Sequence, residues 1–154
     1  MRYTSYASVR KGEPMSTFSL RVIACDRIFY DGRCEQVILP ISDGSMGVKA
    51  HHENLAVAIE VGELKIQKED GTWENGVVGT GFAQIINNRV TVIVDTAEHP
   101  EEIDVRRAKE AKERAEEQIR QHNSMIEYRM GQASLARAMS RLRVTHNNNR
   151  PIGY

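Results

Sequence analysis

Charged side chains with the spacing of helix turns gather in the last third of the chain. Asp104 and Arg107 lie three residues apart and Arg114 follows seven residues later, so one edge of a helix would carry all three. Arg137 and Arg141, four residues apart, share a face of a second helical segment. The first turn of a helix favours a phosphate group, and arginine supplies planar bidentate donors. The pattern suits phosphate binding, although ordinary solvated charges on helix faces show the same spacing.

Other catalytic and metal-binding patterns are weak. The glycine-rich GVVGTG segment at residues 76–81 precedes a strand pattern and not a helix, so it lacks the geometry of a dinucleotide loop. No GxxxxGK[ST] motif, Ser-His-Asp set or carboxylate pair stands out. The neighbours His51 and His52 would point apart on a strand and lack a third ligand. We therefore expect no catalytic residue and no metal site.

The composition excludes few partners. Lys plus Arg equals Asp plus Glu at 21 each in 154 residues, so net charge gives no argument for a nucleic acid, a membrane or an acidic partner. Cys25 and Cys34 match no metal or redox spacing, and we expect both to be reduced and buried. No apolar run approaches the roughly 20 residues that a membrane span requires. We expect a soluble or peripheral protein with no nucleic-acid partner and no direct membrane insertion.

The segment from Ile103 to Arg143 predicts two helices that position these charges. Asp104 is placed to cap the first helix, and Ser124 with Glu127 forms an S-x-x-E capping box that starts the second. The first carries a stripe of small residues and the second a longer apolar seam, respectively Ala108, Ala111, Ala115 and Ile119, and Met125, Tyr128, Leu135, Met139 and Leu142. Because only His122 and Asn123 separate the helices, we expect them to lie antiparallel.

Residues 17 to 98 show short alternating apolar runs bounded by turn residues. Asp31-Gly32, Asp70-Gly71 and Asn87-Asn88 predict turns, and Pro40 predicts the end of a strand. The strands expected between them are 18–24, 34–39, 46–48, 55–59, 63–67, 73–78, 82–86 and 90–95. Turns every 8 to 12 residues without an intervening helix favour an antiparallel sandwich.

These patterns divide the chain into four parts. Residues 1–14, whose opening ten residues lack acids, predict an upstream extension or an added leader outside the fold. The sandwich is expected over 15–99, the helical hairpin over 100–146 and a polar tail over 147–154. The fold class is therefore α+β, with an N-terminal antiparallel β-sandwich and a C-terminal antiparallel two-helix hairpin.

Four segments carry a resemblance to a known family. They are SDGSMGV at 42–48, GTGFAQIINNRVTVIVDTAE at 79–98, IDVRRA at 103–108 and SLARAMSRLRV at 134–144. Across residues 17–144 the chain resembles the epsilon subunit of bacterial rotary F-type ATP synthases. The resemblance implies a sandwich of about ten strands followed by a two-helix hairpin, in agreement with the pattern.

The resemblance also implies a function. It implies a regulatory, non-catalytic subunit of a proton-transporting ATP synthase, peripheral at the cytoplasmic face of the bacterial cell membrane. The sandwich would bind the gamma subunit and the ring of c subunits. The hairpin, when extended, would reach the alpha and beta subunits and inhibit ATP hydrolysis, and when folded onto the sandwich it would leave hydrolysis free. The basic second helix, with one acid and four arginines from Ser124 to His146, suits acidic surfaces on those subunits.

Bacillus-like members of this family bind ATP in the folded hairpin, and their motif residues match this chain. The resemblance implies ATP as a regulatory ligand, with Mg²⁺ as its companion, held by Glu98, Ile103, Asp104, Arg107, Ala108, Arg114, Arg137 and Arg141. It implies partner contacts at Asp43, Gly44, Ser45 and Arg143. The chain departs from the family at Ser45, where many relatives carry an acid, and in the loop 50–54.

Two other functions remain open at the level of sequence. The chain would be a structural coupling subunit if its hairpin bound no nucleotide. It would be an unrelated β-sandwich adaptor if its basic second helix bound acidic partners of another kind.

Overall fold

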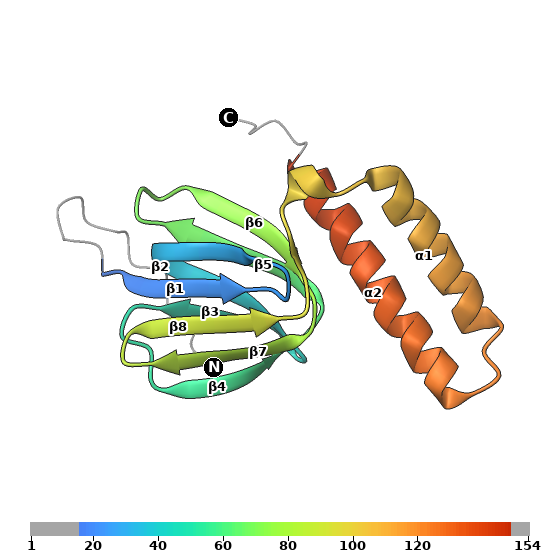
Figure 1. Ribbon diagram of the computed structural model, residues 1–154, viewed down its shortest axis with the longest axis horizontal. Coiled ribbons are helices and arrows are strands. Elements are labelled where there is room, and N and C mark those ends of the chain that lie inside the picture. The colour runs from blue at the N-terminus through green and yellow to red at the C-terminus, as the bar shows by residue number, and fades with distance from the viewer. Residues whose placement is uncertain (1–15, 149–154) are drawn as a thin grey trace, which may run out of the picture.

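The computed structural model describes residues 16–148 as a β-sandwich with a helical hairpin beside it (Figure 1). The strands are β1 (Phe18–Ile23), β2 (Ile28–Ile41), β3 (Gly44–Lys49), β4 (Leu55–Ile59), β5 (Gly62–Lys68), β6 (Trp73–Val78), β7 (Gly81–Ile86), β8 (Arg89–Val94) and β9 (Ala97–Glu98). The helical elements are the 3₁₀ turn η1 (Pro100–Glu102), α1 (Val105–Arg120) and α2 (Met125–Asn148). The predicted fold class is confirmed, with nine strands in the described residues.

The strands follow the hydrogen-bonded order β4-β7-β8-β1-β2-β5-β6-β9, and β3 pairs with β2. The first half of β2 pairs with β1 and its second half with β3 and β5, so this strand links the two layers. All pairs are antiparallel except β1 with β8, which run parallel, a departure from the purely antiparallel prediction. Asn87 and Asn88 have φ of 48° and 62°, which confirms the predicted turn between β7 and β8.

Two predicted breaks in β2 are wrong. Asp31 and Gly32 continue the strand because they pair with Arg21 and Leu20 of β1, and the chain turns earlier, between β1 and β2. Pro40 also lies inside β2, where it pairs with Ser45 of β3. Pairing with β5 ends at Ile38, so β2 is edge-like at Pro40, a position that tolerates a missing N–H.

The sandwich core consists of apolar side chains that alternate along the strands and meet between the layers. Phe18, Leu20, Leu39 and Leu64 are among its largest fully buried members. Cys34 is buried in this core, and burial raises the pKa of its thiol to about 12, so the thiol stays protonated and unreactive. Cys25 is exposed, so the prediction that both thiols are buried is wrong for Cys25.

The hairpin begins and turns as its caps predict. Asp104 caps α1 by accepting a hydrogen bond of 3.1 Å from the Arg107 backbone N–H. At the second helix Ser124 Oγ accepts from the Glu127 N–H at 3.2 Å, and Glu127 accepts from the Asn123 N–H at 2.9 Å. α2 continues to Asn148, beyond the predicted boundary at residue 146. The predicted extension 1–14 and most of the predicted tail lie outside the described residues.

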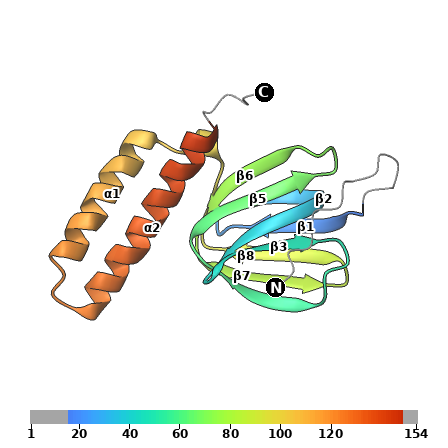
Figure 2. The ribbon, with the colours of Figure 1, turned by 180° about the vertical axis from the view of Figure 1, so that it is seen from behind.

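The helices contact each other through small residues. Ala108 and Ala115 of the predicted stripe are buried in α1. Gly131 of α2 allows a close approach, since a Cβ there would lie 2.9 Å from Ile119 Cγ1. The predicted apolar seam of α2 is wrong at both Met125 and Met139, which are 64% and 42% exposed. α2 lies between α1 and the sandwich, so small buried residues are distributed over two covered faces (Figures 1 and 2).

Candidate functional site

A pocket of about 280 Å³ lies where β9, η1 and the start of α1 meet α2. Most of the residues expected to bind a nucleotide line it. The lining residues are Glu98, Glu102, Ile103, Asp104, Arg107, Ala108, Ala111, Arg114 and Arg141. The fold thus brings together seven of the eight sequence-predicted residues, of which Glu98 and Arg141 lie 43 positions apart in the chain.

The first turn of α1 forms one wall of the pocket. Ile103 follows η1 directly, and its N–H donates to the Pro100 carbonyl at 3.3 Å. Asp104 then caps the helix, and Ala108, whose side chain is buried, follows one turn later. A helix start combines unsatisfied backbone N–H groups with the positive end of the dipole, so this wall favours an anionic ligand.

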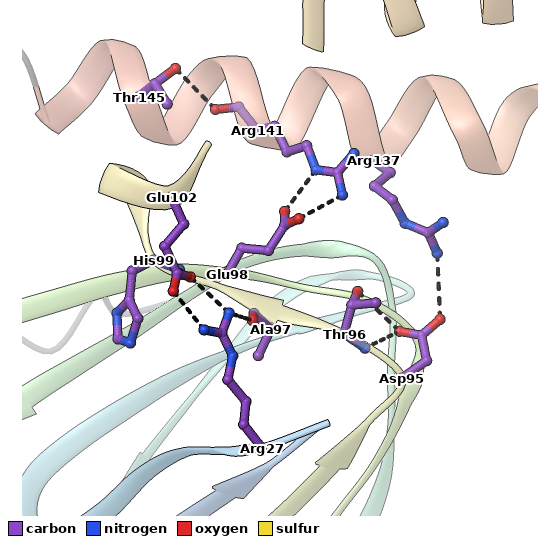
Figure 3. Close-up of polar contacts among 10 residues, drawn as sticks. All are labelled: Arg27, Asp95, Thr96, Ala97, Glu98, His99, Glu102, Arg137, Arg141 and Thr145. Carbon is purple, nitrogen blue, oxygen red and sulfur yellow. Dashed lines mark hydrogen bonds and ion pairs between the residues drawn. The ribbon is translucent and has the colours of Figure 1, made fainter. Parts of the chain in front are cut away.

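Arg141 of α2 also lines the pocket, and its guanidinium points toward Glu98 (Figure 3). Its Nε and Nη2 each donate to a carboxylate oxygen of Glu98 at 2.7 Å. The two side chains are only 28% and 29% exposed, which makes this bidentate pair less screened than a surface pair. Glu98 belongs to β9, so the pair ties α2 to the edge of the sandwich.

Arg137 lies outside the pocket lining. Its Nη2 is 3.4 Å from Asp95 Oδ2, in the short segment between β8 and β9 (Figure 3). Arg137 therefore contributes a second, longer ion pair between α2 and the sandwich. Its role in binding a nucleotide stays a prediction.

Glu102 is a pocket residue that the sequence interpretation missed. Its carboxylate accepts two hydrogen bonds from Arg27, at 2.5 and 2.7 Å, and one from the His99 N–H at 2.9 Å. The hydrogen bonds from Arg27, followed by the His99 N–H, lower the pKa of Glu102 to about 2. Nothing local pointed to its partner Arg27, which lies 75 residues away in the chain.

The pocket pairs some of its charges and leaves others unpaired. Three carboxylates and three guanidinium groups line it. Glu98 is neutralised by Arg141, and Glu102 by Arg27. Within residues 16–148, Arg107 and Arg114 form no ion pair. Two unpaired guanidinium groups beside a helix start can neutralise a multiply charged anion such as a polyphosphate.

The other predicted sites lie elsewhere. Asp43 lies in the exposed turn between β2 and β3, and the exposed residues Gly44, with φ of 124°, and Ser45 begin β3. Arg143 is exposed on α2. Across residues 16–148, no three His, Cys, Asp or Glu side chains lie together in an arrangement that would hold a metal ion.

The fold and the pocket define a class of protein, a β-sandwich that carries a helical hairpin with an anion-suited pocket at their junction. Family models agree with both parts. The model described as "ATP synthase, Delta/Epsilon chain, beta-sandwich domain" matches residues 17–100, and the "long alpha-helix domain" of the same chains matches 101–146. The chain belongs to the ATP synthase delta/epsilon chain family.

Bacterial relatives cover nearly the whole chain. An ATP synthase epsilon chain of Ruminiclostridium cellulolyticum is 48% identical over 86% of this chain and 98% of its own length. One of Caldicellulosiruptor bescii is 38% identical over 90% of this chain and 100% of its own. Neither described helix combines the length and the apolar character needed to cross a bilayer.

Solved structures share the fold at low sequence identity. A chain of the Euglena gracilis mitochondrial ATP synthase, from an OSCP/F1/c-ring structure, superposes with a TM-score of 0.74 at 22% identity and covers 90% of this chain and 88% of that one. A chain of the Tetrahymena thermophila mitochondrial ATP synthase, from a central stalk/c-ring structure, gives a TM-score of 0.60 at 10% identity, covering 82% of this chain and 95% of that one.

Proposed function

We propose that this protein is a non-catalytic, regulatory rotor subunit of a bacterial F-type ATP synthase. The sandwich couples the gamma subunit of the central stalk to the c-subunit ring, and the hairpin regulates ATP hydrolysis. Family membership and the epsilon chains among its relatives support this proposal. The protein then lies peripherally on the cytoplasmic face of the cell membrane, in a complex that transports protons.

Two exposed parts of the sandwich support the partner contacts. The exposed segment Asp43, Gly44 and Ser45, where the turn enters β3, would meet the polar edge of the c-subunit ring. On β7 and β8 the paired side chains of Phe82 and Ile93 are 51% and 40% exposed. The main contacts of α2 outside the hairpin are with β5, β6 and η1, whereas these two apolar side chains are exposed, and neighbouring exposed apolar side chains are typical of a protein contact. We assign the face that carries them to the gamma subunit.

ATP is the regulatory ligand in this proposal, and the pocket is its site. The observation that carries it is the pair of unpaired guanidinium groups, Arg107 and Arg114, beside the start of α1. They suit the triphosphate. Asp104 and Arg107 come from α1 and Arg141 from α2, so only the compact hairpin assembles the site.

This assembly makes ATP a switch. A ligand that binds one state alone stabilises it by RT ln(1 + [L]/Kd), which is about 1.4 kcal/mol at ten times Kd and shifts the population about tenfold. High ATP therefore holds the hairpin on the sandwich. At low ATP the hairpin extends toward the alpha and beta subunits, where the basic α2 meets acidic surface and inhibits hydrolysis.

Calorimetric titration of ATP into the isolated protein, with and without Mg²⁺, tests the site. Arg107→Ala and Arg141→Ala should each weaken binding about tenfold or more, because each removes a charge-assisted donor. The matched control is Arg106→Ala, which removes the neighbouring guanidinium that pairs with Glu110 outside the pocket. No binding at millimolar ATP, or equal losses in Arg106→Ala and Arg107→Ala, would refute ATP binding here.

Regulation is tested in the assembled enzyme. Deleting residues 104–154 should raise ATP hydrolysis at low ATP, because the inhibitory element is gone. Unchanged hydrolysis would leave a purely structural coupling subunit. Copurification of the full chain with its gamma subunit excludes the unrelated adaptor, whereas failure to copurify would refute the rotor assignment.

A further inference from the structure

Arg27 connects the body of the sandwich to the rim of the pocket. It lies in the turn between β1 and β2, and its guanidinium has three acceptors on the segment before α1 (Figure 3). Nη1 donates to Glu102 Oε1 at 2.5 Å, and Nη2 donates to Glu102 Oε2 at 2.7 Å and to the Ala97 carbonyl at 2.5 Å. One side chain thus holds both the residue before Glu98 and the last residue of η1.

This arrangement fixes the backbone on which the pocket depends. The Glu102 carboxylate also accepts a hydrogen bond of 2.9 Å from the His99 N–H, which closes the η1 turn. Arg27 binds the same carboxylate and so attaches the turn to the sandwich. Only Ile103 and Asp104 separate η1 from α1. The position of the α1 start therefore follows from the position of Glu102.

Arg27 also neutralises the Glu102 carboxylate at the edge of the pocket. Glu102 lines the pocket, and in the described residues its cationic partner is Arg27, which is not among the lining residues. Without Arg27, an ionised and unpaired carboxylate would face the bound anion. Like charges at short range in a partly desolvated site oppose binding.

We propose that Arg27 is a positioning residue for the anionic ligand of this pocket: it holds η1 and the α1 start in place and neutralises Glu102, without touching the ligand. The inference rests on the proposed function for its ligand, ATP. Its structural half, the anchoring of residues 99–108, stands independently of any nucleotide.

The test compares the full chain with Arg27→Ala, Arg27→Ala combined with Glu102→Gln, and Arg21→Ala. Arg21 is a matched control, because it forms an exposed ion pair with Asp31 within β1 and β2, at 2.9 Å, without any link to the hairpin. Calorimetry gives the ATP affinity, and hydrogen exchange without nucleotide gives the protection of the hydrogen-bonded backbone amides within 99–108, which are those of His99, Glu102, Ile103, Arg107 and Ala108. Circular dichroism confirms that each variant is folded.

Arg27→Ala should bind ATP about tenfold more weakly and exchange these hydrogen-bonded amides at least tenfold faster, with Arg21→Ala unchanged. The double variant should recover only part of the affinity and none of the protection, because it removes the carboxylate charge but leaves η1 unanchored. Wild-type affinity and protection in Arg27→Ala would overturn the proposal, and affinity that stays low in the double variant would overturn the neutralisation. If the wild type binds no ATP, the proposed function fails, and the exchange rates alone still decide whether Arg27 anchors the segment.

Discussion

The sandwich and the hairpin are held by different interactions. Between the sandwich layers, large side chains such as Leu20, Leu39 and Leu64 are fully buried. The hairpin is held by alanines, by Gly131 and by ion pairs. Among the ion pairs that join α2 to the sandwich edge, Arg141 with Glu98 is the least exposed to solvent. Burying a large apolar side chain contributes about 1.5 to 3 kcal/mol, whereas partly exposed ion pairs contribute less.

This difference suits the proposed function, in which the sandwich is permanent and the hairpin moves. Separating the sandwich layers would expose the whole apolar core. Detaching the hairpin exposes mainly small side chains and charges, which water solvates well. The four predictions below test this division, beginning with the largest expected effect.

Leu64→Ala should destabilise the sandwich by about 2 to 5 kcal/mol, because it leaves a cavity in a fully packed core. Urea unfolding followed by circular dichroism measures the loss. Leu55→Ala on β4, where the side chain is 39% exposed, is the matched control and should cost much less. Equal losses at the two positions would contradict a sandwich held by its core.

Gly131→Val should separate α1 from α2 and cost about 1 to 3 kcal/mol in the hairpin, because even its Cβ would lie 2.9 Å from Ile119 Cγ1. Hydrogen exchange should accelerate in both helices and stay slow in the β-strands. Ala133→Val, on an exposed part of the same helix, introduces the same side chain and should leave the hairpin in place. Acceleration in the strands as well would show that the two parts are coupled.

Arg141→Ala should weaken attachment of the hairpin by about 1 kcal/mol, because it breaks a bidentate pair that is partly open to solvent. Amide exchange in α2, measured without nucleotide, should rise about fivefold. Arg129→Ala, an exposed arginine of the same helix, supplies the baseline. A fivefold rise in both variants would mean that the total positive charge of α2, and not the ion pair of Arg141 with Glu98, holds this helix on the sandwich.

Acid should release the η1 anchor before it affects the apolar core. The pKa of Glu102 is about 2 in the fold against an ordinary 4.5, so its stabilising effect is complete above about pH 4.5 and disappears as pH falls toward 2. The stability difference between wild type and Glu102→Gln, from urea titrations, should therefore shrink over that interval. A constant difference for Glu102→Gln over that interval would refute the linkage.

Spacing grouped part of the pocket lining, and the family resemblance supplied Glu98, Ile103 and Ala108. Asp104 and Arg107 belong to one helix turn, and their spacing alone places them together. Glu98 was assigned by resemblance alone, and its contact with Arg141 at 2.7 Å depends on how α2 lies against β9. Arg27 could not be predicted, because its contacts join segments 75 residues apart.

The errors in the predicted fold have one cause, the tertiary partner. Gly32 and Pro40 favour breaks locally, yet pairing with β1 and β3 keeps both inside β2. The exposed Met125 and Met139 show the same effect in the hairpin. Hydrophobic spacing predicted one covered face, whereas α2 has two, and Gly131 lies where the backbones approach.

The two residues between η1 and α1 set the reach of the hairpin. Ile103 and Asp104 span at most about 7 Å even when fully extended. If the hairpin detached from the sandwich, the start of α1 would therefore stay close to Glu102, and the hairpin could only rotate about that point. At about 1.5 Å per residue, α1 is roughly 24 Å long and α2 roughly 36 Å, so only the opening of the turn between them would carry the end of α2 about 60 Å from the sandwich.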